Sequence, residues 1–128
     1  MSDMEWKKVC CPVDFSEPSR AALRVAADMC QRFGAELTLL HVADTAAAPG
    51  CDTKLREWGT DVEKSGVSLQ TAHAVGDPQL AIVDYARQGG FQLIVMGTHG
   101  RTGRDHAFAG SVAESVVRRA ACPVLTVR

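Results

Sequence analysis

Short, nearly continuous apolar runs alternate with longer amphipathic segments along the chain. Three such runs are KVCCPV (residues 8–13), LTLLHV (37–42) and FQLIVM (91–96). Strands with so few polar residues lie in the middle of parallel sheets, where helices cover both faces. The alternation therefore predicts an α/β fold in which helices connect parallel strands.

Two further segments are predicted as edge strands. Residues 67–75 (VSLQTAHAV) mix polar residues throughout, and residues 123–128 (PVLTVR) are short and terminal. With the three apolar strands in the middle and right-handed crossovers, the predicted arrangement is a single doubly wound five-stranded parallel sheet of order 3-2-1-4-5, with helices on both faces. Pro12 is compatible with this arrangement because proline is tolerated near the end of a strand.

The connecting helices have recognisable ends. Ser16 can cap the first, which carries Pro18 in its first turn. Gly59 weakens the second. The four helices are expected to run from Ser16 to Gly34, over about residues 53–64, from Asp77 to Gly89 and from Ser111 onward, where SVAE forms a capping box.

Composition excludes several classes of function. The 128 residues carry a formal net charge of −1 and suit one domain spanning residues 1–128. Balanced charge argues against a nucleic-acid partner. No apolar run reaches the ~20 residues that span a bilayer, and no signal peptide is visible, so we expect a cytoplasmic protein without a membrane partner. None of the five cysteines forms a Cys-x-x-Cys pair, so no zinc site is expected.

The predicted strand order locates a site before any motif is considered. The chain reverses direction between the first and fourth strands, and ligands of doubly wound sheets bind outside the carboxyl ends of the strands at this point. Those ends are Val13-Asp14 and Met96-Gly97.

A glycine-rich segment follows the fourth strand, with Gly97, Gly100 and Gly103 ahead of Gly110-Ser111 at a helix start. Glycines let backbone N–H groups approach an anion closely, and a helix N-terminus adds free donors. The spacing is neither a Walker A loop nor Gly-x-Gly-x-x-Gly. The same glycines could equally shape a turn and a helix entry, so both interpretations stay open.

The spacing Gly97-x2-Gly100-x9-Gly110-Ser111, after LIVM and before VAESVVRRAACPVLTVR, resembles the nucleotide-binding signature of the universal stress protein family. The segments KVCCPVDFSEPSRAAL and GDPQLAIVDYA are similar to that family too, so the resemblance covers residues 7–128. It implies a five-stranded α/β fold of the order given above. The ATP-binding branch of the family carries this glycine spacing, whereas the other branch lacks it and binds no nucleotide.

The resemblance implies two groups of binding residues. The group for adenine and ribose is Pro12, Val13, Asp14, Val42 and Met96. The group for the phosphates is Gly97, His99, Gly100, Gly110, Ser111 and Val112, with Arg101 able to pair with a terminal phosphate. The implied ligand is ATP, or AMP or ADP, with Mg²⁺ accompanying the phosphates. Ordinary roles remain open: Asp14 could form a turn, the valines could be core, Ser111 could cap its helix, and Arg101 could be solvated.

Two departures from the family pattern keep an alternative open. Residues 104–109 (RDHAFA) are more polar than the segment usual before the Gly-Ser pair, and the connection from Val42 to Val67 is short, so one sheet face could be thinly covered. The alternative is a nucleotide-free dimeric protein that acts through interactions.

Catalytic residues are hard to find. Phosphoanhydride hydrolysis needs a positioned base and metal carboxylates near the phosphates. Only His99, Asp105 and His106 lie near the predicted loop, and such residues are more often solvated. We therefore expect no catalytic residue, no metal site built by the protein, and at most a slow ATPase.

The last strand points to self-association. Residues 124–127 (VLTV) are apolar and would leave an exposed sheet edge. The family forms dimers through this strand, so the resemblance implies a homodimer, although twist and Arg128 alone could shield the edge. The expected function is a nucleotide-responsive regulator in stress adaptation.

Overall fold

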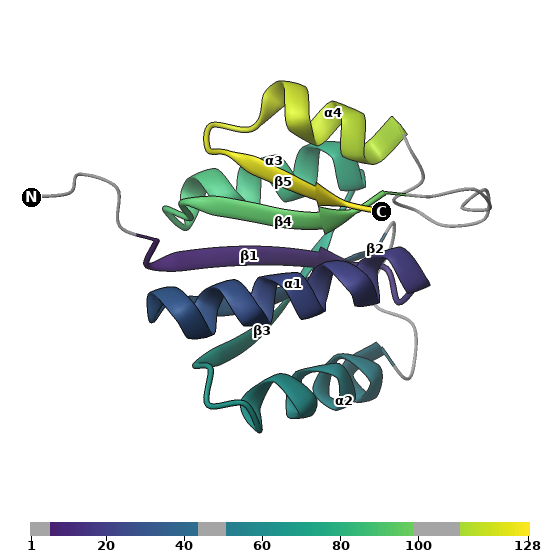
Figure 1. Cartoon of the computed structure of the whole chain (residues 1–128). Helices are drawn as coiled ribbons and strands as arrows, with labels where there is room; N and C mark the ends of the chain where they lie inside the picture. The colour runs from purple at the N-terminus through teal and green to yellow at the C-terminus, as the bar shows by residue number, and fades with distance from the viewer. Residues whose placement is uncertain (1–5, 44–50, 99–110) are drawn as a thin grey trace, which may run out of the picture.

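The computed structural model describes residues 6–43, 51–98 and 111–128. Strands and helices alternate along the chain (Figure 1). The strands are β1 (Lys8–Val13), β2 (Glu36–Ala43), β3 (Leu69–Val75), β4 (Leu93–Gly97) and β5 (Val124–Val127), and the helices are α1 (Glu17–Phe33), α2 (Cys51–Glu63), α3 (Pro78–Gln88) and α4 (Ser111–Arg119). The sheet is parallel, in the order β3-β2-β1-β4-β5, so the predicted fold class and strand order are confirmed.

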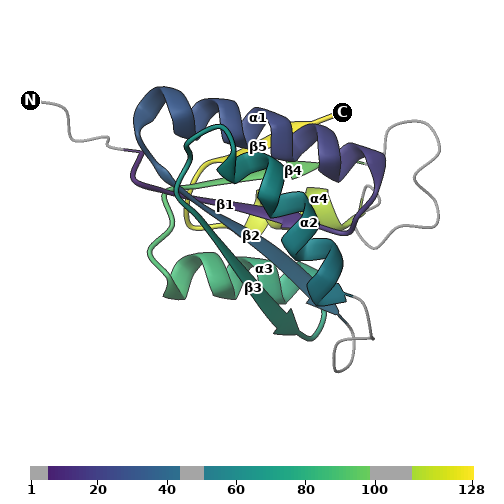
Figure 2. The same ribbon diagram turned by 90° about the horizontal axis from the view of Figure 1, so that it is seen from below.

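Helices cover both faces of the sheet, with α1 and α2 on one side and α3 and α4 on the other (Figure 2). Side chains alternate between the two faces along a strand. The neighbours Cys11 and Cys10 show this directly, because Cys11 packs in the core under α1 and α2 whereas Cys10 packs in the core under α3 and α4. The side chains of the pair therefore point in opposite directions.

Three cysteines behave as small buried apolar groups. Cys10, Cys11 and Cys30 are buried, and Cys122 is half-buried. Burial raises the pKa of Cys30 to about 11 and also raises the pKa values of Cys10 and Cys11. These three thiols therefore stay protonated near neutral pH.

The ends of α1 follow the expected pattern. Ser16 is the N-cap, and its Oγ accepts a hydrogen bond from the N–H of Ser19 at 3.3 Å. Gly34 closes the helix in a left-handed conformation (φ 67°) and donates its N–H to the carbonyl of Cys30. A residue with a Cβ adopts this conformation only at a cost, which explains the glycine.

Helix α2 begins two residues earlier than predicted. Its first residue is Cys51, whereas the sequence predicted a helix over about residues 53–64. Leu55 and Val62 are buried against the sheet, so this face is covered despite the short connection. A Cβ on Gly59 would lie 2.5 Å from the Cδ2 atom of Leu69 on β3. The glycine that weakens the helix thus lets it approach β3 closely.

The two sheet edges are the predicted ones. Strand β3 carries several exposed residues, including Val75 with 60% of its surface exposed. Strand β5 at the other edge is half-exposed, and its Leu125 is 38% exposed.

Candidate functional site

The backbone pairing between the two central strands, β1 and β4, ends before their carboxyl ends. Strand β1 pairs with β2 along its whole length, as far as Val13 opposite His41. Its registered pairs with β4 are Val9 and Cys10 alone. Strand β4 meanwhile pairs with β5 up to its last residue, Gly97. The pairing between β1 and β4 therefore stops at the position where the strand order reverses.

The backbone of β1 explains why this pairing stops. The carbonyl of Lys8 accepts a hydrogen bond from the N–H of Gln92, immediately before β4, at 2.9 Å. Backbone polar groups of a strand point alternately to its two neighbours, so every second residue after Lys8 faces β4, and Pro12 is among them. Proline has no N–H, so the ladder toward β4 loses a donor at this residue.

Four of the side chains assigned to the ligand gather on one sheet face. Val42, Met96 and Val112 belong to the core under α3 and α4, and each is less than a tenth exposed. Pro12 is fully buried and faces the same side by alternation with Cys10. Val13 instead packs in the core under α1 and α2, so its side chain is separated from the other four by the sheet.

Asp14 follows β1 directly and has a structural role. Its Oδ1 atom accepts hydrogen bonds from the N–H of Ser16, at 3.0 Å, and from the Ser16 hydroxyl. Because Ser16 caps α1, Asp14 helps to fix the start of that helix. The turn role that the sequence left open for Asp14 is therefore present. The same contacts hold the carboxylate at the carboxyl end of β1.

Gly97 is required by packing of the backbone. A Cβ at this position would lie 2.3 Å from the carbonyl oxygen of Pro18 and 2.8 Å from the nitrogen of Ser19. The first turn of α1 thus approaches the end of β4 so closely that only glycine fits. This reason for the glycine is independent of any ligand.

Phe15 is a feature that the sequence did not reveal. Its φ is 65°, in the left-handed region that non-glycine residues rarely occupy. Its ring lies 5.0 Å from that of His41 and meets Trp58 edge-on at 5.1 Å, measured between centroids. Such a conformation costs on the order of 1–3 kcal/mol and persists only where the surroundings impose it.

A chain of three polar groups lies beside Phe15. His41 and His73 occupy the same register on β2 and β3, and their Nδ1 atoms are 3.4 Å apart. The Nε2 atom of His73 hydrogen-bonds Asp52 in the first turn of α2. With both rings neutral, Nε2–H of His73 donates to Asp52, and Nδ1–H of His41 donates to Nδ1 of His73.

His41 is held in its neutral form. Its pKa is lowered from the usual value by burial and then by the neighbouring His73, while Asp14 and Asp52 oppose the shift. The sequence offered no motif for this cluster. Once the register of β2 and β3 is known, however, the two histidines fall opposite one another.

The comparisons with known proteins identify the family. A sequence model described as "Universal stress protein family" matches residues 5–128. The chain belongs to this family. It is 34% identical to universal stress protein MJ0531 of Methanocaldococcus jannaschii, and the match covers 96% of this chain and 82% of that protein.

Solved structures of the family share the fold. A universal stress protein in complex with cAMP is 25% identical, with a TM-score of 0.81, and the match covers 98% of each chain. The solved structure of MJ0577 is 29% identical to this chain, with a TM-score of 0.84. The match covers 97% of this chain and 96% of MJ0577.

Four of the residues implied for phosphate binding lie outside the described residues, namely His99, Gly100, Arg101 and Gly110. Ser111 is the first residue of α4. Within residues 6–43, 51–98 and 111–128, no group of three or more histidine, cysteine or acidic residues is placed to hold a metal ion. In the same ranges, no helix has the length and apolar character needed to cross a bilayer.

Proposed function

We propose that this universal stress protein binds ATP at the carboxyl ends of β1 and β4 and acts as a nucleotide-responsive regulator in stress adaptation in the cytoplasm. The observation that carries the proposal is the end of pairing between β1 and β4 at the switch point of the sheet, with Asp14 fixed beside it. Ligands of doubly wound sheets bind at such points. The relative in complex with cAMP supports an adenine nucleotide as the ligand class.

In this proposal the base and ribose meet the end of β1. The Asp14 carboxylate accepts hydrogen bonds from ribose hydroxyls while Ser16 keeps it in place. Val42, Met96 and Val112 support the base from within the core. Pro12 and Val13 are placed at the end of β1 and contribute chiefly backbone atoms. AMP or ADP would make the same contacts.

The phosphates, with Mg²⁺ accompanying them, lie near the start of α4. The chain has a net charge of −1, so a basic surface field does not attract the nucleotide. Backbone N–H groups and the positive end of the α4 dipole act instead. The residues assigned to this role are Gly97, His99, Gly100, Arg101, Gly110, Ser111 and Val112.

We extend the proposal to the organisation of the whole protein. Residues 1–128 form one domain, and two copies associate through β5. The exposed apolar side chain of Leu125 on this edge strand supports the association. Each dimer would then carry two nucleotide sites.

Calorimetric titration with ATP and Mg²⁺ tests the nucleotide site. Asp14→Asn keeps an oxygen acceptor for the N–H of Ser16 but removes the charge, so we expect a loss of affinity of roughly tenfold, the scale of one hydrogen bond to a charged group. The matched control is Asp84→Asn on the exposed surface of α3, which should leave the affinity unchanged.

A second arm tests the glycine segment. Gly110→Val places a bulky side chain where a phosphate would approach the backbone, and we expect it to abolish binding. The purified protein is also denatured, and any released nucleotide is identified by mass spectrometry. No heat with millimolar ATP, together with no released nucleotide, would overturn the proposal in favour of a nucleotide-free interaction protein.

A further inference from the structure

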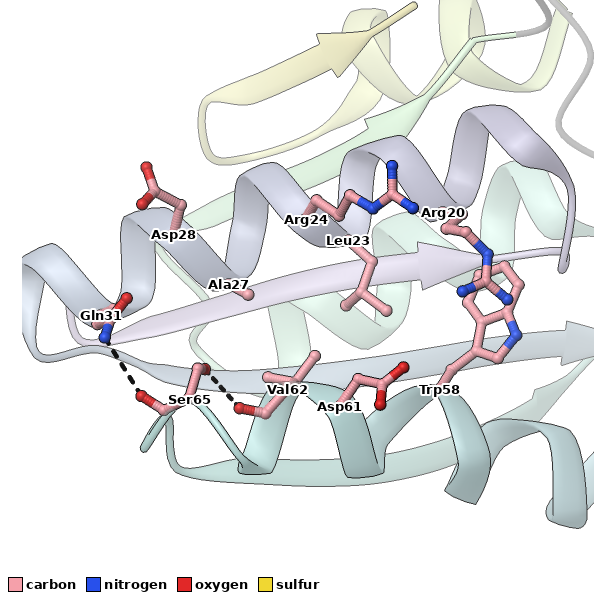
Figure 3. Close-up of a pocket in the computed structure, with 10 residues that line it drawn as sticks. All are labelled: Arg20, Leu23, Arg24, Ala27, Asp28, Gln31, Trp58, Asp61, Val62 and Ser65. Atoms are coloured by element: carbon pink, nitrogen blue, oxygen red, sulfur yellow. Dashed lines mark hydrogen bonds between the residues drawn. The ribbon is translucent and has the colours of Figure 1, made fainter.

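A groove of about 310 Å³ runs between α1 and α2, on the face of the sheet opposite α3 and α4 (Figure 3). Leu23 of α1 and Val62 of α2 point toward one another across it, and both are nearly buried. The ring of Trp58 stands at one end. This volume is at the lower end of the range for small-molecule sites, about 300–1,000 Å³.

At one end of the groove, an exposed hydrogen bond links α1 to the residues that follow α2. The Nε2 atom of Gln31 on α1 donates to the carbonyl oxygen of Ser65, just beyond α2, at 3.3 Å (Figure 3). An extended peptide or a helix would need an open path along both helices. This link and the small volume of about 310 Å³ favour a compact occupant over a polypeptide.

The other end presents two arginines. The guanidinium carbon of Arg20 lies 4.4 Å from the centroid of the Trp58 ring, and this stacking holds the planar group in one orientation. Arg24 lies one helical turn further along α1 and is exposed. In the part of the chain that the structure describes, neither arginine forms an ion pair. Three other arginines do so with an acid on their own helix: Arg32 with Asp28, Arg87 with Asp84 and Arg118 with Glu114.

The acidic residues of the groove do not cancel this charge. Asp28 lies on its wall but is paired with Arg32 at 2.9 Å. Asp61 on α2 is the other acidic residue of the lining, and no ion pair joins it to a described arginine. The lining thus carries two unpaired guanidinium groups, both on α1, and one unpaired carboxylate, on α2.

We infer that this groove binds a small amphipathic anion. The ligand class is a carboxylate or sulfonate on an apolar body the size of one aromatic ring with a short chain. The body packs over Leu23 and Val62 and against Trp58, and the anionic group binds Arg20 and Arg24. The inference does not depend on the proposed nucleotide site, which lies at the switch point between β1 and β4.

Phenylbutyrate is the probe, and neutral phenylbutanol is its matched control. The chain contains two tryptophans, Trp6 and Trp58, so a Trp6→Phe background makes the fluorescence report on Trp58 alone. Amide NMR shifts provide the second readout. We expect the acid to change Trp58 emission and to shift amides of α1 and α2, with an affinity about three- to fivefold above that of the alcohol, the factor given by a partly exposed ion pair.

Charge variants separate a local contact from a general effect of charge. Arg24→Gln should lower the affinity for the acid about three- to fivefold and leave the affinity for the alcohol unchanged. Arg20→Lys keeps the charge but loses the planar stacking on Trp58, so it should lower the affinity for the acid by a smaller factor than Arg24→Gln does. Arg56→Gln removes the same charge from an exposed position of α2 outside the groove and should change neither affinity.

Four results would overturn the inference. Equal affinity for acid and alcohol would remove the role of the arginines. An equal loss in Arg24→Gln and Arg56→Gln would reduce the effect to net charge. Displacement of phenylbutyrate by ATP would place the probe in a nucleotide site instead. Finally, if phenylbutyrate at about 10 mM gave no signal while an acidic amphipathic peptide shifted the same amides, the groove would be a peptide surface.

Discussion

At the scale of single residues, the end of β1 combines a fixed carboxylate with a backbone outlier. Asp14 is held by Ser16, and the next residue, Phe15, has a φ of 65°. The rings of His41 and Trp58 flank Phe15, so aromatic packing offsets a conformation that a non-glycine residue otherwise avoids. Strained backbone of this kind is concentrated at ligand-binding turns, which agrees with the site proposed here.

A comparison of two substitutions tests this balance. Phe15→Ala removes the ring contacts but keeps the unfavourable φ, and we expect a loss of about 1–3 kcal/mol in the free energy of unfolding. Phe15→Gly removes the same contacts and relieves the backbone, so it should be more stable than Phe15→Ala by about 1 kcal/mol. Urea denaturation measures both. The idea fails if the glycine variant is the less stable of the two.

The lowered pKa of His41 predicts an acid-sensitive contribution to stability. The unfolded chain protonates this ring near the usual 6.5, whereas the folded protein does so only at lower pH. Between these values the unfolded state binds more protons, so the contribution is complete above about pH 6.5 and decreases as the pH falls through the folded pKa.

His41→Asn provides the measurement. Asparagine can still donate to Nδ1 of His73 but does not titrate, so the loss of stability between pH 7.5 and 5.0 should be smaller than in the unmodified protein. Urea midpoints at several pH values give the two slopes, and ring NMR signals of His41 follow the titration directly. Identical slopes in the two proteins would contradict the assignment.

At the scale of helices and strands, local patterns predicted most of what the structure contains. The caps at Ser16 and Gly34 depend on neighbouring residues only, and both are confirmed. The early start of α2 at Cys51 was not predicted, because its first turn contacts β3 through Asp52 and His73, which are distant in sequence. Long-range packing likewise explains two glycines whose roles the sequence could not define, Gly59 and Gly97.

Gly97→Ala tests whether packing requires the glycine at the end of β4. The added Cβ would overlap the carbonyl of Pro18, which is backbone and cannot rotate away, so we expect a loss of about 1–3 kcal/mol or more in stability. Gly66→Ala is the control: its Cβ would meet open space, and only its φ of 90° opposes the side chain. Thermal denaturation should show the larger decrease for Gly97→Ala, and equal stability with the unmodified chain would refute the packing role.

At the scale of the whole molecule, the switch point of the sheet was more predictable than the faces on which the surrounding side chains lie. The strand order alone located the switch point, because it depends on which strands are apolar. The separation of Val13 from Val42 and Met96 by the sheet was not foreseen, since a family resemblance assigns residues to a ligand without assigning their side chains to a face. The groove between α1 and α2 was not predicted for a related reason. Its lining residues come from two helices, and the hydrophobic periodicity of each helix does not show how the two pack together.

Association through β5 is a prediction for the assembled protein. We expect the unmodified chain to sediment as a dimer at micromolar concentration. Leu125→Glu places a charge on the exposed apolar edge, and burying it in an interface should raise the dissociation constant at least about 100-fold, equivalent to ~3 kcal/mol. Val75→Glu is the matched control, because Val75 is an exposed apolar residue on the opposite edge strand β3.

Sedimentation velocity distinguishes the outcomes. A monomer from Leu125→Glu and a dimer from Val75→Glu would assign the interface to β5. The reverse result would assign it to β3, and a monomeric unmodified chain would remove the dimer altogether. Because a parallel sheet has two edges and both carry an exposed apolar side chain here, the comparison of the two variants is what decides which edge associates.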